Sequence, residues 1–77
     1  MSTEFTPNVT ETAIVPMSQK INFTRLVSDA AGTFGLEVTV NRCFLTDGSA
    51  GYQIAIYGEP EYVSGYAKMI KAGDFNI

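Results

Sequence analysis

Two alternating segments joined by a glycine-rich turn constrain the fold of this chain more than any other feature. Residues 36–41 alternate between apolar and polar side chains, and residues 52–58 have large apolar side chains in phase at every second position, which is typical of half-buried strands. The apolar positions of the two segments are Leu36, Val38, Val40, Tyr52, Ile54 and Ile56. Residues 46–51 between them read Thr-Asp-Gly-Ser-Ala-Gly, a typical hairpin turn. The chain is therefore expected to fold around an antiparallel hairpin with one apolar face.

The end of the first segment disturbs this alternation. Phe44 is in phase with the apolar face, but the charged side chain of Arg42 is not suited to that face. A bulge near Arg42 or Cys43, or a ragged strand edge, would reconcile the two residues.

A first helix is predicted before the hairpin, over residues 23–34. Apolar residues recur there at the spacing of one helix face. Ser18 or Asn22 is a suitable N-terminal cap, and Gly35 stands where a left-handed terminator is expected.

A second helix is predicted after the hairpin, over residues 60–71. Pro60 suits its first position, Glu59 and Glu61 suit its positive N-terminal end, and Gly73 follows as a terminator. Residues 74–77 then form a last short extended piece, in which Phe75 and Ile77 are expected to pack back on the core.

A short strand over residues 13–17 precedes both helices. Pro16 donates no ladder hydrogen bond, so this strand is expected at a sheet edge or to end there. The fold class is therefore α+β, a small antiparallel sheet with two helices on one face in β-α-β-β-α order. Two arrangements remain open: a ferredoxin-like unit with its last strand reduced to residues 74–77, and an αββα unit whose sheet is completed by another chain.

The chain is short enough for one domain only. Its 77 residues fall below the usual domain size of about 100–150 residues. Residues 1–12 are polar and rich in Thr, and they are expected to form a flexible N-terminal tail. Residues 13–77 are expected to form a single α+β domain.

The residue inventory disfavours catalysis, so we expect no enzyme and no cofactor. The chain has no His and one Cys, Cys43. An internal disulfide has no second thiol, a zinc site of the usual type lacks its ligands, and a His-activated nucleophile cannot be assembled. A domain this small without these supports is marginally stable, which raises the expectation of a partner.

Charge and hydropathy set the expected surroundings of the protein. The formal net charge of -3 disfavours nucleic acid, whose phosphates require Lys and Arg. Residues 1–12 lack the basic start and apolar run of a secretory signal, and no apolar run is long enough to span a membrane. We expect a cytoplasmic protein.

The strand residues that face away from the predicted helices form the candidate partner-binding site. These residues are Thr39, Asn41, Gln53, Ala55 and Tyr57, with Cys43 beside them. They make a small, neutral surface with almost no charge. Because the centres of protein interfaces are depleted in charged residues and enriched in Tyr, this surface indicates protein association.

The function expected from these features is non-enzymatic protein binding. The chain is expected to be a small accessory or inhibitory protein that docks on a larger enzyme or assembly. Its size and acidity are typical of phage-encoded inhibitors of host machinery. The alternatives are a dimeric domain that senses a small ligand and a structural subunit of a larger particle. A homodimer formed through a sheet edge is compatible with the docking protein and with the ligand-sensing domain.

Overall fold

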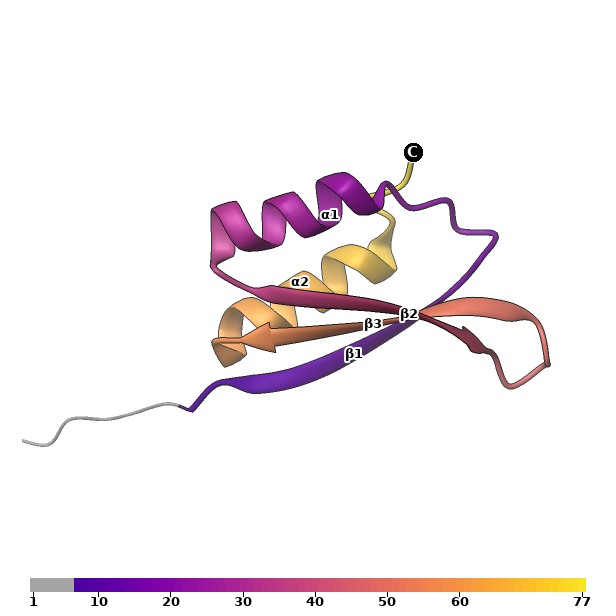
Figure 1. Cartoon of the computed structure of the whole chain (residues 1–77), viewed down its shortest axis with the longest axis horizontal. Coiled ribbons are helices and arrows are strands. Elements are labelled where there is room, and N and C mark those ends of the chain that lie inside the picture. The colour runs from indigo at the N-terminus through magenta and orange to yellow at the C-terminus, as the bar shows by residue number, and fades with distance from the viewer. Residues whose placement is uncertain (1–6) are drawn as a thin grey trace, which may run out of the picture.

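The structure is a computed structural model that describes residues 7–77. It forms one antiparallel sheet with both helices on one side (Figure 1). The elements in chain order are β1 (Val9–Pro16), α1 (Phe23–Asp29), the π-helical turn η1 (Ala30–Phe34), β2 (Glu37–Phe44), β3 (Ala50–Gly58) and α2 (Pro60–Ala72). The α+β prediction, with two helices on one sheet, is confirmed.

The sheet has the order β1-β3-β2, and β3 pairs antiparallel with both neighbours. β1 and β2 therefore run parallel to each other with β3 between them, as in a split βαβ unit. Pro16 is the last residue of β1, an edge strand, as its missing N–H group predicts. This strand order favours the truncated ferredoxin-like arrangement over the αββα arrangement, because β1 pairs with β3 inside the chain.

The boundary predicted between the tail and the domain is wrong. β1 begins at Val9, so residues 9–12 belong to the sheet and not to a flexible tail. Val9 pairs with Gly58, and Thr12 pairs with Ala55. The backbone groups of residues 55–58 on the β1 side of β3 need hydrogen-bond partners. Residues 9–12 supply them, and the β-branched side chains of this Thr-rich segment suit a strand. Residues 1–6 of the predicted tail lie outside the described residues.

The bulge predicted near Arg42 or Cys43 is also wrong. β2 and β3 pair without interruption from Glu37 opposite Tyr57 to Phe44 opposite Ala50. The hairpin extends beyond the helix layer (Figure 1). Arg42 therefore occupies the helix side of the sheet at a place where it stays exposed, and it needs no bulge.

Local signals set the ends of both helices. The side chain of Asn22 accepts a hydrogen bond from the Arg25 N–H group at 3.1 Å, so Asn22 is the cap of α1. Gly35 follows η1 with a φ angle of 65°, and Gly73 follows α2 with a φ angle of 89°. Both glycines hold the left-handed conformation that other residues rarely adopt. Pro60 occupies the first position of α2, as predicted.

The core lies between the sheet and the two helices. Its fully buried large side chains are Tyr66, Phe75, Leu26, Ile54, Ile56, Ile70, Val15 and Val63. Phe34 and Phe75 both lie against the ring of Tyr66, with centroid separations of 5.5 Å and 5.1 Å. The Tyr66 hydroxyl donates a hydrogen bond to the carbonyl oxygen of Leu26, which ties α2 to α1.

Tyr66 should make part of the stability depend on alkaline pH. Burial, followed by the negative charge of Asp29, raises the pKa of Tyr66 to about 12. An unfolded tyrosine has a pKa of about 10, so the neutral hydroxyl stabilises the fold fully below about pH 10. This contribution is lost as the pH rises through about 12.

We expect Tyr66→Phe to lower the free energy of unfolding by about 1 kcal/mol at pH 7, because one buried hydrogen bond is lost. Between pH 10 and pH 12 the wild type should lose stability relative to this variant. Urea unfolding at several pH values measures the difference. A difference that stays constant from pH 7 to pH 12 would contradict the role given to the hydroxyl.

The C-terminal segment packs on the core but does not join the sheet. Phe75 is fully buried, as predicted, whereas Ile77 is 89% exposed and the expectation that it packs back is wrong. The segment pairs with the stretch before α1: the Asn22 N–H group donates to the Phe75 carbonyl at 2.7 Å, and the Ile77 N–H group donates to the Lys20 carbonyl at 2.8 Å. Among residues 7–77, the outer edge of β1 therefore has no neighbouring strand.

Candidate protein-binding surface

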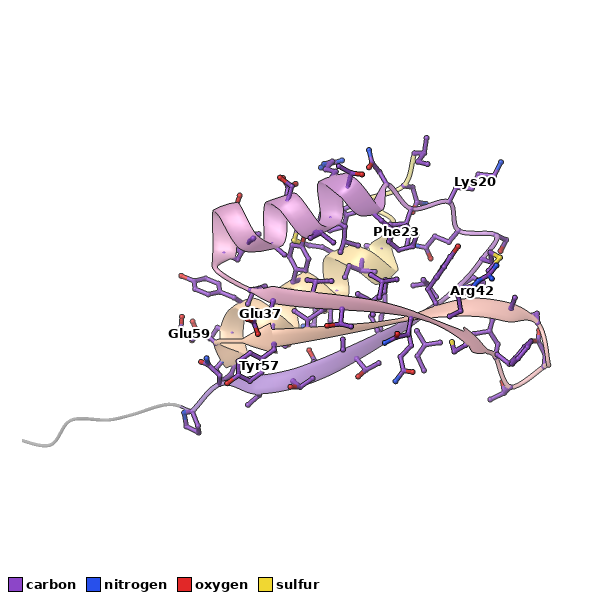
Figure 2. All side chains as sticks on the ribbon, in the orientation of Figure 1. Lys20, Phe23, Glu37, Arg42, Tyr57 and Glu59 are labelled. Carbon is purple, nitrogen blue, oxygen red and sulfur yellow. The ribbon has the colours of Figure 1, made fainter. Side chains whose placement is uncertain are left out.

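The sheet side opposite the helices is uncovered by the described chain, and strand alternation decides which residues it presents. We call this surface the open face. Its residues are Thr10, Thr12, Ile14, Glu37, Thr39, Asn41, Cys43, Gln53, Ala55 and Tyr57. Figure 2 shows Tyr57 on the side of the sheet away from the helices.

The structure brings the five predicted site residues together on this open face. Thr39 lies opposite Ala55, and Asn41 lies opposite Gln53 on neighbouring strands. Tyr57 follows Ala55 as the next residue of β3 on the open face and is 42% exposed. Their shared placement follows from the regular register of the hairpin, which was the strongest pattern in the sequence.

β1 adds a third row that sequence reasoning missed. Thr10 lies opposite Tyr57, Thr12 opposite Ala55, and Ile14 opposite Gln53. Ile14 is 55% exposed and is a large apolar side chain of the open face. Local patterns do not indicate this row, because Glu11 and Ile14 interrupt the alternation of residues 9–15 and the polar composition of residues 9–12 predicts a tail.

The open face is nearly free of charge. Among residues 7–77, Glu37 is the only charged residue on it. The other charged residues lie on the helices, in loops, in the hairpin turn or on the helix side of the sheet: Glu11, Lys20, Arg25, Asp29, Arg42, Asp47, Glu59, Glu61, Lys68, Lys71 and Asp74. The open face instead offers hydroxyl, amide and phenol groups, which hydrogen-bond without the desolvation cost of an ion.

The described part of the chain holds no cluster of metal-ligating side chains. It contains no cluster of three or more His, Cys, Asp or Glu residues that could hold a metal ion. No buried side-chain nitrogen or oxygen atom there lacks a hydrogen-bond partner. Glu59 and Glu61 flank the first residue of α2, are exposed, and suit the helix N-terminus.

Asp47 has a structural role in the hairpin turn. Its carboxylate accepts hydrogen bonds from the Ser49 hydroxyl at 2.6 Å and from the Ser49 N–H group at 3.0 Å. These bonds, that of the hydroxyl above all, hold the pKa of Asp47 below its ordinary value. The side chain closes the turn through these hydrogen bonds. It is fully exposed and therefore does not line a pocket.

Among the surface hollows of residues 7–77, two lie along β2. One, of about 350 Å³, lies at the end of the hairpin and is lined by Met17, Arg42, Cys43, Phe44 and Ala50. The other, of about 450 Å³, lies beside β2 and is lined by Val27, Ala31, Leu36, Glu37, Val38 and Thr39. Sequence reasoning found neither, because both depend on how far the helices reach over the sheet.

Comparison with known proteins identifies no relative. No protein-family model, no curated protein and no solved structure matches the chain. Neither helix of residues 7–77 has the length and apolar character needed to cross a membrane. The function must therefore be argued from the open face itself.

Proposed function

We propose that the protein is a non-enzymatic protein-binding module whose open face docks on a larger enzyme or assembly in the cytoplasm. The observation that supports this proposal is the near absence of charge on a surface of three strands, where Glu37 carries the only charge among residues 7–77. Charged residues are depleted at the centres of interfaces, where water is excluded.

The polar groups of the open face suit a partner that is also largely neutral. Asn41 and Gln53 lie side by side and each presents an amide donor and acceptor. Tyr57 adds an aromatic ring with a hydroxyl group, the kind of side chain that is enriched at interface hot spots. A docked partner would cover apolar side chains such as Ile14 and would satisfy these amides by hydrogen bonds.

Substitutions on the open face should weaken docking without unfolding the protein. We expect Tyr57→Ala to lower affinity for the partner by about thirty-fold or more, the effect of truncating a hot-spot residue. Asn41→Arg should have a comparable effect, because it places an unpaired charge at the centre of the interface. Both residues are exposed, so the fold of a single copy should change little.

The test is affinity capture from a lysate of the source cells with the wild type and these variants. Lys68→Ala, an exposed change on α2, is the matched control. The proposal requires one stoichiometric protein that the wild type and Lys68→Ala retain and that Tyr57→Ala and Asn41→Arg lose. Equal retention by all four chains would refute the docking role of the open face.

A further inference from the structure

The outer edge of β2 has unpaired backbone groups that point away from the sheet. The Leu45 N–H group donates to the Ser49 carbonyl at 2.8 Å, and the antiparallel register continues from that pair. Odd-numbered residues of β2 therefore bond to β3, and the even-numbered residues turn their N–H and C=O groups outward. The outward residues are Val38, Val40, Arg42 and Phe44. Within residues 7–77 no strand pairs with them.

The same edge carries an exposed aromatic side chain at one end and a surface hollow of mixed polarity at the other. Phe44 is 82% exposed and lies on the helix side of the sheet, beyond the helix layer. The hollow of about 450 Å³ lies between the helical segment formed by α1 and η1 and the first half of β2. Val27, Ala31 and Val38 supply the apolar part of its wall, and Leu36, Glu37 and Thr39 complete it. A cavity of about 150 Å³ is enough to hold benzene, so this hollow has room for a phenylalanine ring.

We propose that two copies of the chain pair antiparallel through their β2 edges about a two-fold axis at Asn41, and that Phe44 of each copy fills the hollow beside Val38 of the other. A two-fold axis perpendicular to the sheet keeps both helix layers on the same side. Phe44 of one copy therefore lies opposite Val38 of the second copy and on the side where the hollow opens.

The Asn41-centred register uses the edge completely. It pairs Val38 with Phe44 and Val40 with Arg42, so each of the outward residues faces another outward residue. A shift to Val40 or Thr39 as the centre leaves Phe44 opposite residue 36 or residue 34, which lie before the start of β2. The Asn41 register also opposes no like charges, because Glu37 faces Leu45 and Arg42 faces Val40.

The other edge of the sheet is less suited to this pairing. The outward residues of β1 are Thr10, Thr12, Ile14 and Pro16, as the hydrogen bond from the Met17 N–H group to the Ala50 carbonyl indicates. Pro16 has no N–H group, and such a residue is a common device against edge pairing. β2 contains no proline and no bulge.

This dimer does not depend on the proposed docking function. It joins two three-stranded sheets into one, so the two open faces become a single surface on the side opposite the helices. A partner is not needed to form it, and loss of the dimer does not by itself remove the open face of one copy.

Disulfide trapping tests the register. Asn41 faces its own copy in a pair without backbone hydrogen bonds, where the Cα atoms are about 4.5 Å apart, and this separation permits a disulfide. Asn41→Cys combined with Cys43→Ser should therefore form a covalent dimer under mild oxidation. Thr39→Cys combined with Cys43→Ser is the control and should stay uncrosslinked, because its two thiols would be about 13 Å apart along the strand. Equal crosslinking of the two variants, or none in either, would overturn the proposed register.

Sedimentation tests the role of Phe44. Phe44→Glu should raise the dimer dissociation constant by about thirty-fold or more while the monomer stays folded, since the side chain is exposed in one copy. Ile14→Glu, the same kind of change on the other edge strand, should leave the dimer intact and impair only docking. A wild type that sediments as a monomer over a wide concentration range, or a dimer unaffected by Phe44→Glu, would refute the proposal.

Discussion

Phe75→Ala should lower the free energy of unfolding by about 3–5 kcal/mol, the usual cost of truncating a buried phenylalanine. The Phe75 side chain is 1% exposed and lies against Tyr66, and the guanidinium of Arg25 sits 5.3 Å from its ring centroid. A domain of this length typically has about 4–12 kcal/mol of stability in total. The substitution should therefore remove much of the free energy of unfolding, and the variant should unfold on mild heating.

Ile77→Ala is the control for this result, because it changes the same segment at a side chain that is 89% exposed. We expect it to change stability by less than about 0.5 kcal/mol. Urea unfolding of both variants at one fixed protein concentration gives the comparison. A cost of less than about 1 kcal/mol for Phe75→Ala would contradict the placement of this ring at the end of the core.

Phe75 also shows how far sequence reasoning reaches. The sequence predicts that this side chain packs back on the core, since it is apolar and follows the terminator Gly73. Its segment pairs with residues 20–22, of which sequence patterns identify only Asn22, as a suitable helix cap. The pairing depends on where α1 and α2 end relative to each other, and no local pattern carries that information.

The parts of the fold that were predicted correctly rest on local signals. The hairpin follows from alternation on both sides of one turn, and the ends of the helices follow from Asn22, Gly35, Pro60 and Gly73. Each of these signals acts within a few residues of the feature it sets. They agree with one another, which is the condition under which sequence patterns are reliable.

The predictions that failed depend on contacts between distant segments. Residues 9–12 look like a polar tail by composition, but β3 provides the partner that makes them a strand. Arg42 and Phe44 would be misplaced on the apolar face only if the helices covered the whole hairpin. The helix layer stops short of them, so both side chains stay exposed without a bulge.

The candidate site was predicted on two of its three strands for the same reason. Thr39, Asn41, Gln53, Ala55 and Tyr57 follow from the alternation of the hairpin alone. The row from β1, with Ile14 as its large apolar side chain, required the pairing of β1 with β3. The hollow beside β2 could not be predicted from the sequence, because a hollow depends on the distance between a helix and a strand.

Ile54→Ala should destabilise the fold by about 2–5 kcal/mol, whereas the neighbouring change Gln53→Ala should alter stability by less than about 0.5 kcal/mol. Ile54 is completely buried at the centre of the sheet, opposite Ala13 on one side and Val40 on the other. Gln53 is exposed on the open face. The two residues are adjacent in β3, so the contrast measures which face of this strand is the core.

Chemical denaturation measures the free energy of unfolding of both variants. The protein concentration is held constant because association adds to apparent stability. The midpoint should fall for Ile54→Ala while the dependence on denaturant stays the same, as for a loss of packing in an intact fold. Gln53→Ala should unfold like the wild type, and its only defect should be a lower affinity for the docked partner. A cost for Gln53→Ala as large as that for Ile54→Ala would mean that the open face is covered within the monomer, and the docking proposal would fail with it.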